Sequence, residues 1–203
     1  SKHRRMDITM KAFTAFYKQN PKDTVFLFTC SANSQTGWNL EEMVSMELGA
    51  KHDCIKFIEV KDTTLFNILL SCCDVGVHTN DGIDVPILAA QHAMIGVPQI
   101  IGNFGGYKDY FNVDNATMLD YVDEYSYPNH AGSIGGEGYI VGVPDVVRGL
   151  NKYYSNPSLR KEYEYSFREN WDDIFDKFNQ YVLNDDIKKD NIANENTVLR
   201  HVS

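Results

Sequence analysis

The chain has 203 residues, of which 43% are apolar and 12% aromatic, so it is long enough to bury the core of one large domain. Its formal net charge of −9 argues against a general nucleic-acid-binding protein, because such a protein needs a basic surface to meet phosphates. The sequence contains no signal peptide and no apolar run near the ~18 residues of a membrane-spanning helix. We therefore expect a cytosolic protein without a membrane span.

The four cysteines predict neither a metal site nor a disulfide framework. Cys30, Cys54 and the adjacent pair Cys72-Cys73 form no CxxC motif, and neighbouring cysteines do not easily bridge to each other. Three of the four lie in or beside predicted strands, so we expect reduced, buried thiols and no bound metal.

The first third of the chain alternates between helical and strand patterns. Apolar residues recur at helical spacing from Met6 to Tyr17, and a nearly continuous apolar run typical of a strand buried on both faces follows. The predicted elements are a helix over residues 6–17, a strand over 24–30, a helix over 39–48, a strand over 55–60 and a helix over 63–72. This alternation indicates βαβ units and a parallel sheet.

Residues 74–106 say most about where a ligand would bind. They predict a strand over 74–78, a polar loop over 79–84, a helix over 86–94, a strand over 99–101 and a glycine-rich loop over 102–106. The two loops follow the carboxyl ends of two parallel strands, which is where open α/β sheets bind ligands.

The remaining residues complete one domain and a tail. We predict a short strand over 117–119, a long loop over 120–138, and helices over 144–154, 158–169 and 171–183, with a polar tail over 184–203. The fold class is therefore α/β, with a Rossmann-like parallel sheet flanked by helices and followed by C-terminal helices. We assign residues 1–183 to this domain.

The start of the chain is unusual for that class. A doubly wound domain normally begins with a strand, whereas Arg4 and Arg5 already stand at the start of a helix. Either an N-terminal strand is missing, or the chain is part of a longer protein, and we favour the second interpretation.

Several short motifs follow one another in an order that matches a known family. In chain order they are Arg4-Arg5-Met6-Asp7-Ile8 with Ala12-Phe13, Gly96-Val97-Pro98, Gly105-Gly106 with Asp109-Tyr110, and the stretch from Asp145 to Arg160. From Arg4 to about Trp171 the chain resembles the C-terminal half of a GT-B glycosyltransferase of retaining family 4. In its general sequence character it is similar to the glycosyltransferases of large algal DNA viruses.

The resemblance implies a division of labour between two domains. In such enzymes the C-terminal domain binds the nucleotide-sugar donor and the N-terminal domain, which would be missing here, binds the acceptor. Basic residues at the first helix bind the diphosphate, a role that passes to Arg4 and Arg5. Guanidinium groups beside a helix N-terminus favour a dianion. The alternative is two solvated arginines.

The chain departs from the family at a pair of glutamates spaced eight residues apart. Aligned without gaps, their positions hold Ile83 and Gln91, and of these only Gln91 can hydrogen-bond a ribose hydroxyl. Asp81 or Asp84 can substitute from the same loop, or both can simply serve the turn. The expected donor-binding residues are Arg4, Arg5, Asn80, Asp81, Gly82, Ile83, Asp84, Gln91, Gly105 and Gly106. We assign no catalytic residue and expect neither a metal nor a cofactor besides the nucleotide-sugar substrate.

Two functions remain open at this point. The first is the donor-binding part of an enzyme that transfers a hexose from a nucleotide diphosphate sugar to an acceptor glycan, inactive as this chain alone. The second is a non-catalytic pseudo-glycosyltransferase module used for binding or assembly. A different nucleotide-binding enzyme, such as an epimerase, would be expected to carry GxGxxG after its first strand, and that motif is not seen.

Overall fold

The computed structural model describes residues 4–32, 39–49, 53–82, 86–127, 136–161 and 176. The chain forms two compact units, Ser1–Tyr165 and Ser166–Ser203, and the fold below is that of the first. Apart from Asp176, the helix predicted over 171–183 lies outside the described residues, and so do most of the helix predicted over 158–169 and the domain boundary at 183.

The first sheet has two parallel strands, β1 (Phe26–Phe28) and β2 (Ile55–Phe57). They are shorter than the predicted strands. Two helices, α1 (Met6–Gln19) and α2 (Leu40–Leu48), pack on this sheet. The shared buried cluster is Met10, Phe13, Phe28, Leu40, Val44, Cys54 and Ile55.

Side-chain caps begin two of the helices, near the predicted helix starts. Asn39 accepts a hydrogen bond from the Glu42 backbone N–H at 3.1 Å at the start of α2. Asp62 accepts one from the Leu65 backbone N–H at 2.8 Å and begins α3 (Thr63–Ser71).

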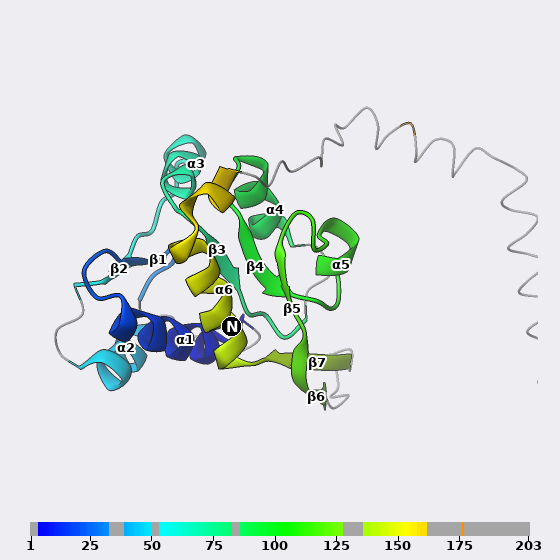
Figure 1. Ribbon diagram of the computed structural model, residues 1–203, viewed down its shortest axis with the longest axis horizontal. Coiled ribbons are helices and arrows are strands. Elements are labelled where there is room, and N and C mark those ends of the chain that lie inside the picture. Colours follow the sequence, from blue (N-terminus) through cyan, green and yellow to red (C-terminus); the bar gives the residue numbers. More distant parts are fainter. Residues whose placement is uncertain are drawn as a thin grey trace, which may run out of the picture. The chain divides into compact units, whose positions relative to one another are not determined.

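The second sheet has three parallel strands in the order β3 (Gly76–His78), β4 (Gln99–Gly102) and β5 (Thr117–Leu119) (Figure 1). Side chains alternate across β4, so Ile100 and Ile101 belong to different buried clusters. Ile100 packs with α1 and α6 (Val143–Ser155), and Ile101 packs with α4 (Ile87–Met94) and α5 (Tyr107–Tyr110). Helices thus cover both faces of a parallel sheet, which confirms the predicted fold class.

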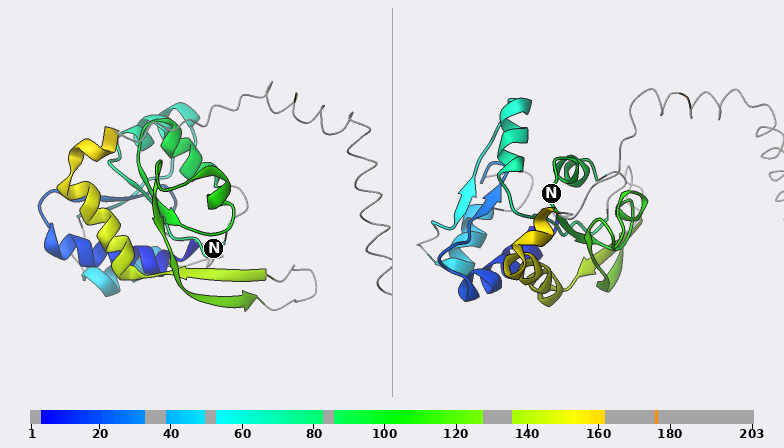
Figure 2. Two further views of the ribbon diagram at one scale, coloured as in Figure 1. Left: turned by 45° about the vertical axis from the view of Figure 1, so that its right-hand side comes forward. Right: turned by 45° about the horizontal axis from the view of Figure 1, so that its top comes forward.

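The prediction of a long loop over 120–138 is wrong. Its ends form an antiparallel hairpin of β6 (Tyr121–Tyr127) and β7 (Gly136–Val141), whose strands extend side by side in Figure 2. Phe104, Tyr121 and Tyr139 form an aromatic cluster at its base, with centroids 4.9 Å apart for the two tyrosines and 5.1 Å for Phe104 and Tyr139. Tertiary aromatic packing therefore gives order to a segment whose sequence is polar.

Two helices end the described part of the first unit. The predicted helix over 144–154 is confirmed by α6, and a 3₁₀ helix (Pro157–Lys161) follows it.

All four cysteines are free, but only Cys54 is fully buried and Cys72 is exposed. The expectation of buried thiols is therefore wrong for Cys72, which directly follows the last turn of α3.

Candidate functional site

The carboxyl ends of β3 and β4 meet at one edge of the second sheet. The two strands are parallel and paired in register, with Gly76 opposite Gln99 and His78 opposite Ile101. Residues 79–82 therefore leave the sheet beside residues 103–106, as the sequence predicted. This edge is the candidate ligand-binding site.

The start of α1 is fastened to this edge by Thr79. The buried Thr79 hydroxyl donates to the backbone carbonyl of Arg5 at 3.0 Å and lies 2.6 Å from the Thr9 hydroxyl. The helix N-terminus and the end of β3 are thus held together. Sequence reasoning missed Thr79, although a small polar residue directly after an apolar strand is the available signal.

The two arginines at this edge differ in their surroundings. Arg5 has a left-handed backbone (φ 45°) and holds Asp7 through two hydrogen bonds, of 3.1 and 3.0 Å. The Asp7 carboxylate raises the pKa of Arg5. Burial disfavours the charged form of Asp7, yet the Arg5 guanidinium holds the pKa of Asp7 below its usual value. Arg4 is exposed.

Asp81 faces the hairpin. Its side chain is buried, its carboxylate accepts a hydrogen bond from the Tyr125 hydroxyl, and its carbonyl accepts one from the Tyr139 backbone N–H at 2.6 Å. Gly138 leaves room for the Tyr125 ring, because a Cβ there would lie 2.7 Å from it and would displace it. Asp81 therefore holds β6 to the end of β3 through its carboxylate and β7 through its backbone carbonyl.

The other predicted site residues lie in the loop after β3, on α4 and at the start of α5. Asn80 is half-buried and Gly82 exposed in the loop after β3, whereas Gln91 is exposed on α4. Gly105 is exposed with φ 54°, and Gly106, which is buried, begins α5. Ile83 and Asp84 lie outside the described residues.

Two histidines behind the edge serve packing. The side chain of His78 lies 3.1 Å from the Gln99 amide oxygen, and His92 donates to the Leu70 carbonyl at 3.1 Å. Burial, with His92 nearby, lowers the pKa of His78 to about 4, and burial also lowers the pKa of His92. Both rings are therefore neutral at pH 7.

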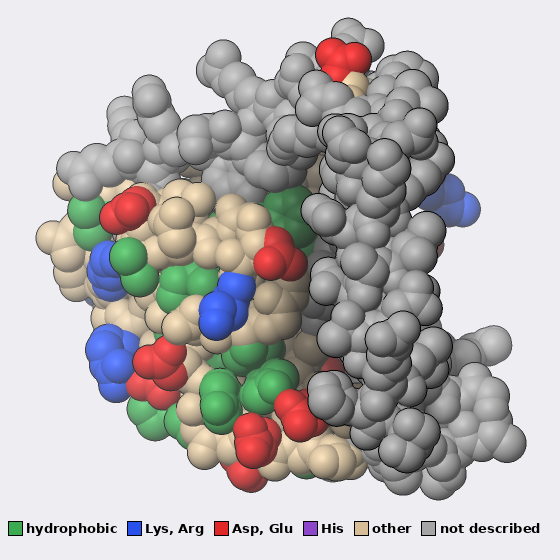
Figure 3. All heavy atoms as spheres, turned by 90° about the vertical axis from the view of Figure 1, so that its right-hand side faces the viewer, with side chains coloured by type: hydrophobic (Ala, Val, Ile, Leu, Met, Phe, Trp, Pro, Cys, Tyr) green, Lys and Arg blue, Asp and Glu red, His purple; other side chains and the backbone are tan. Residues whose placement is uncertain are grey.

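Two wider properties bear on the kind of ligand. No cluster of three or more potential metal-binding side chains occurs among the described residues. Within the same residues, every helix is too short or too polar to cross a bilayer. On the face seen in Figure 3, acidic and basic side chains are interspersed over the described surface and form no single basic patch.

Comparisons with known proteins give the fold without a sequence family. No protein-family model matches the chain, and no curated protein matches it. Among solved structures, Alr3699/HepE of Anabaena in complex with UDP-glucose is similar with a TM-score of 0.57 and 14% identity, over 80% of this chain and 38% of that one.

Two further solved structures are similar at the same level of identity. The C-terminal domain of the group 1 glycosyl transferase LpcC from Francisella tularensis gives a TM-score of 0.59 at 14% identity, over 80% of this chain and 74% of that one. A UDP-forming α,α-trehalose-phosphate synthase from Burkholderia xenovorans gives 0.54 at 14% identity, over 80% and 36%. The chain thus has the fold of a GT-B glycosyltransferase C-terminal domain and spans little more than a third of the longer structures.

Proposed function

We propose that this chain is the donor-binding domain of a glycosyltransferase and holds a nucleotide diphosphate sugar at the carboxyl edge of β3 and β4. One observation carries the proposal: Thr79 fastens the N-terminus of the long helix α1 to that edge. Helix N-terminal amides favour a dianion, which is the charge of a diphosphate. The shared fold with a protein solved in complex with UDP-glucose supports the proposal.

In this proposal some residues at the edge contact the ligand and others keep the site in place. In the proposal Arg4, which is exposed, meets the diphosphate, whereas Arg5 keeps the helix start in place through Asp7. Backbone groups of Gly105 and Gly106 line the second side, and Gln91 is assigned to the ribose hydroxyls. Asn80, Gly82, Ile83 and Asp84 are assigned to the sugar side of the donor.

The chemistry of this chain would be positioning and charge stabilisation. A hexose leaves a nucleoside diphosphate for an acceptor glycan, and the departing diphosphate is stabilised by Arg4 and the helix amides. We propose a retaining, family 4-like enzyme related to those of large algal DNA viruses, located in the cytosol. An N-terminal domain of the same protein would bind the acceptor, so the chain alone should bind the donor without turnover.

The test is a titration of UDP-glucose and GDP-mannose followed by calorimetry. We expect saturable binding of one of them, weakened roughly fivefold or more in Arg4→Ala because a charge-assisted contact is lost. Lys11→Ala is the matched control, since Lys11 is an exposed cation within α1, the helix that Arg4 precedes, and the affinity of this variant should be unchanged. The same titration with EDTA should give the same affinity if, as we propose, no metal takes part.

The second candidate function is a pseudo-glycosyltransferase module. Asp81, one of the acids that could replace the family's glutamates, is buried against Tyr125, and this observation favours the alternative. Absence of binding at millimolar concentrations of both nucleotide sugars would support that module and overturn the donor-binding proposal.

A further inference from the structure

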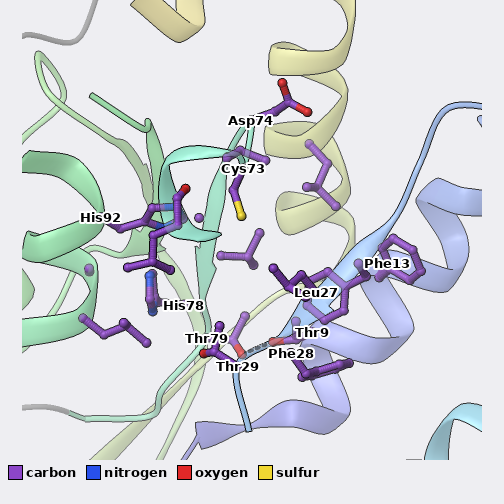
Figure 4. A pocket seen from close by; sticks show the side chains of 18 of the residues that line it. Thr9, Phe13, Leu27, Phe28, Thr29, Cys73, Asp74, His78, Thr79 and His92 are labelled. Carbon is purple, nitrogen blue, oxygen red and sulfur yellow. Dashed lines mark hydrogen bonds between the residues drawn. The ribbon is translucent and has the colours of Figure 1, made fainter. Parts of the chain in front are cut away.

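A cavity of about 930 Å³ separates the two parallel sheets of the first unit. It lies between β1 and β3, and Figure 4 shows Leu27, Phe28, Thr79 and His78 around it. Most of the side chains that line it are apolar. They come from strands of both sheets and from the helices that pack on these sheets. We call it the interstrand slot.

In the part of the chain that the structure describes, neither strand beside the slot has a partner strand on that side. Among the described residues β1 pairs with β2 alone, and β3 pairs with β4 alone, so each sheet ends at the slot. An edge strand presents backbone N–H and C=O groups in the spacing that another strand matches. The two edges therefore face the slot as two halves of an interrupted sheet.

The burial of the strands is also consistent with a sheet interrupted at the slot. All four residues of β4 are buried, whereas β1 and β3 each contain a single buried residue. Val25, directly before β1, is 64% exposed and lines the slot. An apolar strand such as β1 is typical of a sheet interior with neighbours on both sides.

Helices cover the slot from both sides. α1 contributes Ile8 and Phe16 to the cluster around β4, and Met10 and Phe13 to the cluster around β1, so it spans the two sheets. Helix α4 and the end of α3 line the opposite side. The gap between the two parallel strands is thus covered by helices on both faces. These are the surroundings that a strand has inside a sheet.

The length of the slot distinguishes a strand from a small ligand. Its lining runs from Thr24 and Asp74, at the amino ends of β1 and β3, to Thr29 and Thr79 at their carboxyl ends. A nucleotide sugar would occupy the carboxyl edge alone. An extended peptide parallel to both strands would occupy the whole length.

The start of α1 lies at the carboxyl mouth of the slot. Arg4 lines the slot, and the Thr79 hydroxyl lies 3.3 Å from the Arg4 carbonyl. A strand that left the slot at this mouth would continue directly into α1 and then β1. That path is a βαβ unit, whose parallel strands lie side by side with a helical crossover.

We propose that the interstrand slot binds an extended apolar strand joined directly to the start of α1 and parallel to β1 and β3. The strand order becomes β2-β1-new strand-β3-β4-β5. Numbered along the chain, this is the order 3-2-1-4-5-6 of a doubly wound sheet. The inference rests on the slot alone and is independent of the proposed donor binding, because its readouts need no nucleotide.

The first test adds a strand and measures order at both edges. Six residues rich in Val and Ile, about the usual strand length, are fused directly before Ser1, and a Ser/Asn-rich extension of equal length is the control. The apolar extension should raise the Tm by at least about 5 °C. It should also protect the amides of residues 26–28 and 76–78 from hydrogen exchange and abolish fluorescence of the apolar dye ANS.

Each contrary result overturns the proposal. An apolar extension that leaves both edges unprotected, or that protects them only in a dimer seen by size-exclusion chromatography, would show that the slot does not take this strand. If the fused chain fails to fold by circular dichroism, the same hexapeptide is added in trans to the original chain. In that case no rise in Tm at millimolar peptide overturns the inference.

The second test determines the direction of the strand through native cysteines. Cys30 lines the carboxyl end of the slot and Cys73 the amino end, and both are free. In a Cys72→Ser background, a cysteine at the last position of the extension should oxidise to Cys30 and one at the first position to Cys73, because neighbouring strands satisfy disulfide geometry. Peptide mapping that finds the opposite pairing would overturn the parallel arrangement.

Discussion

Two loops leave the carboxyl edge of the second sheet, and they are held in opposite ways. After β3, Thr79 and Asp81 are each only 2% exposed, and their side chains bond to α1 and to β6. After β4, Gly105 is exposed in a left-handed conformation, and its carbonyl accepts from the Lys108 backbone N–H at 3.1 Å. The first loop is fixed by side chains and the second by backbone geometry.

This contrast separates building a site from contacting a ligand. Polar side chains that are buried and bonded, such as Thr79 and Asp81, fix where helix α1 and the hairpin lie. An exposed glycine leaves its backbone open to close approach. We therefore expect the loop after β3 to determine the shape of the edge, and the loop after β4 to contribute backbone contacts to a ligand.

The largest effect should come from Asp81→Ala. The change removes the carboxylate that accepts from the Tyr125 hydroxyl and opens a space in a buried polar contact, so the free energy of unfolding should fall by about 2–4 kcal/mol. Urea unfolding measures it. Asp120→Ala is the control, because the exposed Asp120 bonds Asn103 in the second loop, and it should cost about 0.5 kcal/mol or less. Equal losses in the two variants would contradict the comparison.

Thr79→Val should have the next largest effect. Valine nearly keeps the volume of threonine but removes the hydroxyl that bonds the buried Thr9 hydroxyl and the Arg5 carbonyl, so about 1–3 kcal/mol should be lost in urea unfolding. The Arg5 carbonyl keeps the backbone N–H groups of Ile8 and Thr9 as donors, so the larger part of the loss comes from Thr9. Thr64→Val, at an exposed position of α3, is the matched control and should be close to neutral. A Thr79→Val protein as stable as the control would show that α1 is held at this edge by other contacts.

The loops also show where sequence reasoning succeeds. Strands, helices and caps such as Asn39 and Asp62 follow from patterns within a few residues, and the topology of parallel strands then brings the two loops to one edge. The Arg5–Asp7 ion pair was not predicted, although its partners are only two residues apart, because Arg5 was assigned to the diphosphate.

Sequence reasoning fails where the partner is distant. Tyr125 and Asp81 are 44 residues apart, and neither residue indicates the other. The hairpin itself was missed because β6 carries exposed side chains on both faces, so it lacks the apolar–polar contrast of a half-buried strand. Its aromatic contacts with Phe104 form only in the folded chain.

A pH titration tests the strand that leads into the first loop. The folded chain holds the pKa of His78 at about 4, below its ordinary value of 6.5, because burial disfavours the charged ring. The unfolded chain binds the proton more readily, so stability is complete above pH 6.5 and is lost as the pH falls toward 4. We expect about 1–2 kcal/mol less stability at pH 5 than at pH 7.

The variant His78→Gln identifies the source of that loss. Glutamine does not titrate and can still hydrogen-bond Gln99, so the dependence between pH 7 and 5 should become flatter. The remaining slope belongs to His92, whose pKa is also lowered by burial. An unchanged slope in His78→Gln would mean that His78 is already solvated at the end of β3.

Gly105→Ala should have the smallest effect on stability and tests the second loop. Alanine is strained at φ 54°, which costs about 1 kcal/mol, whereas Gly136→Ala, in open space with no positive φ, should be close to neutral. If the loop after β4 contacts the ligand through its backbone, Gly105→Ala should also weaken UDP-glucose binding, and Gly136→Ala should not. Reduced stability with unchanged affinity would make Gly105 a structural residue like Asp81, and the two loops would then no longer differ in kind.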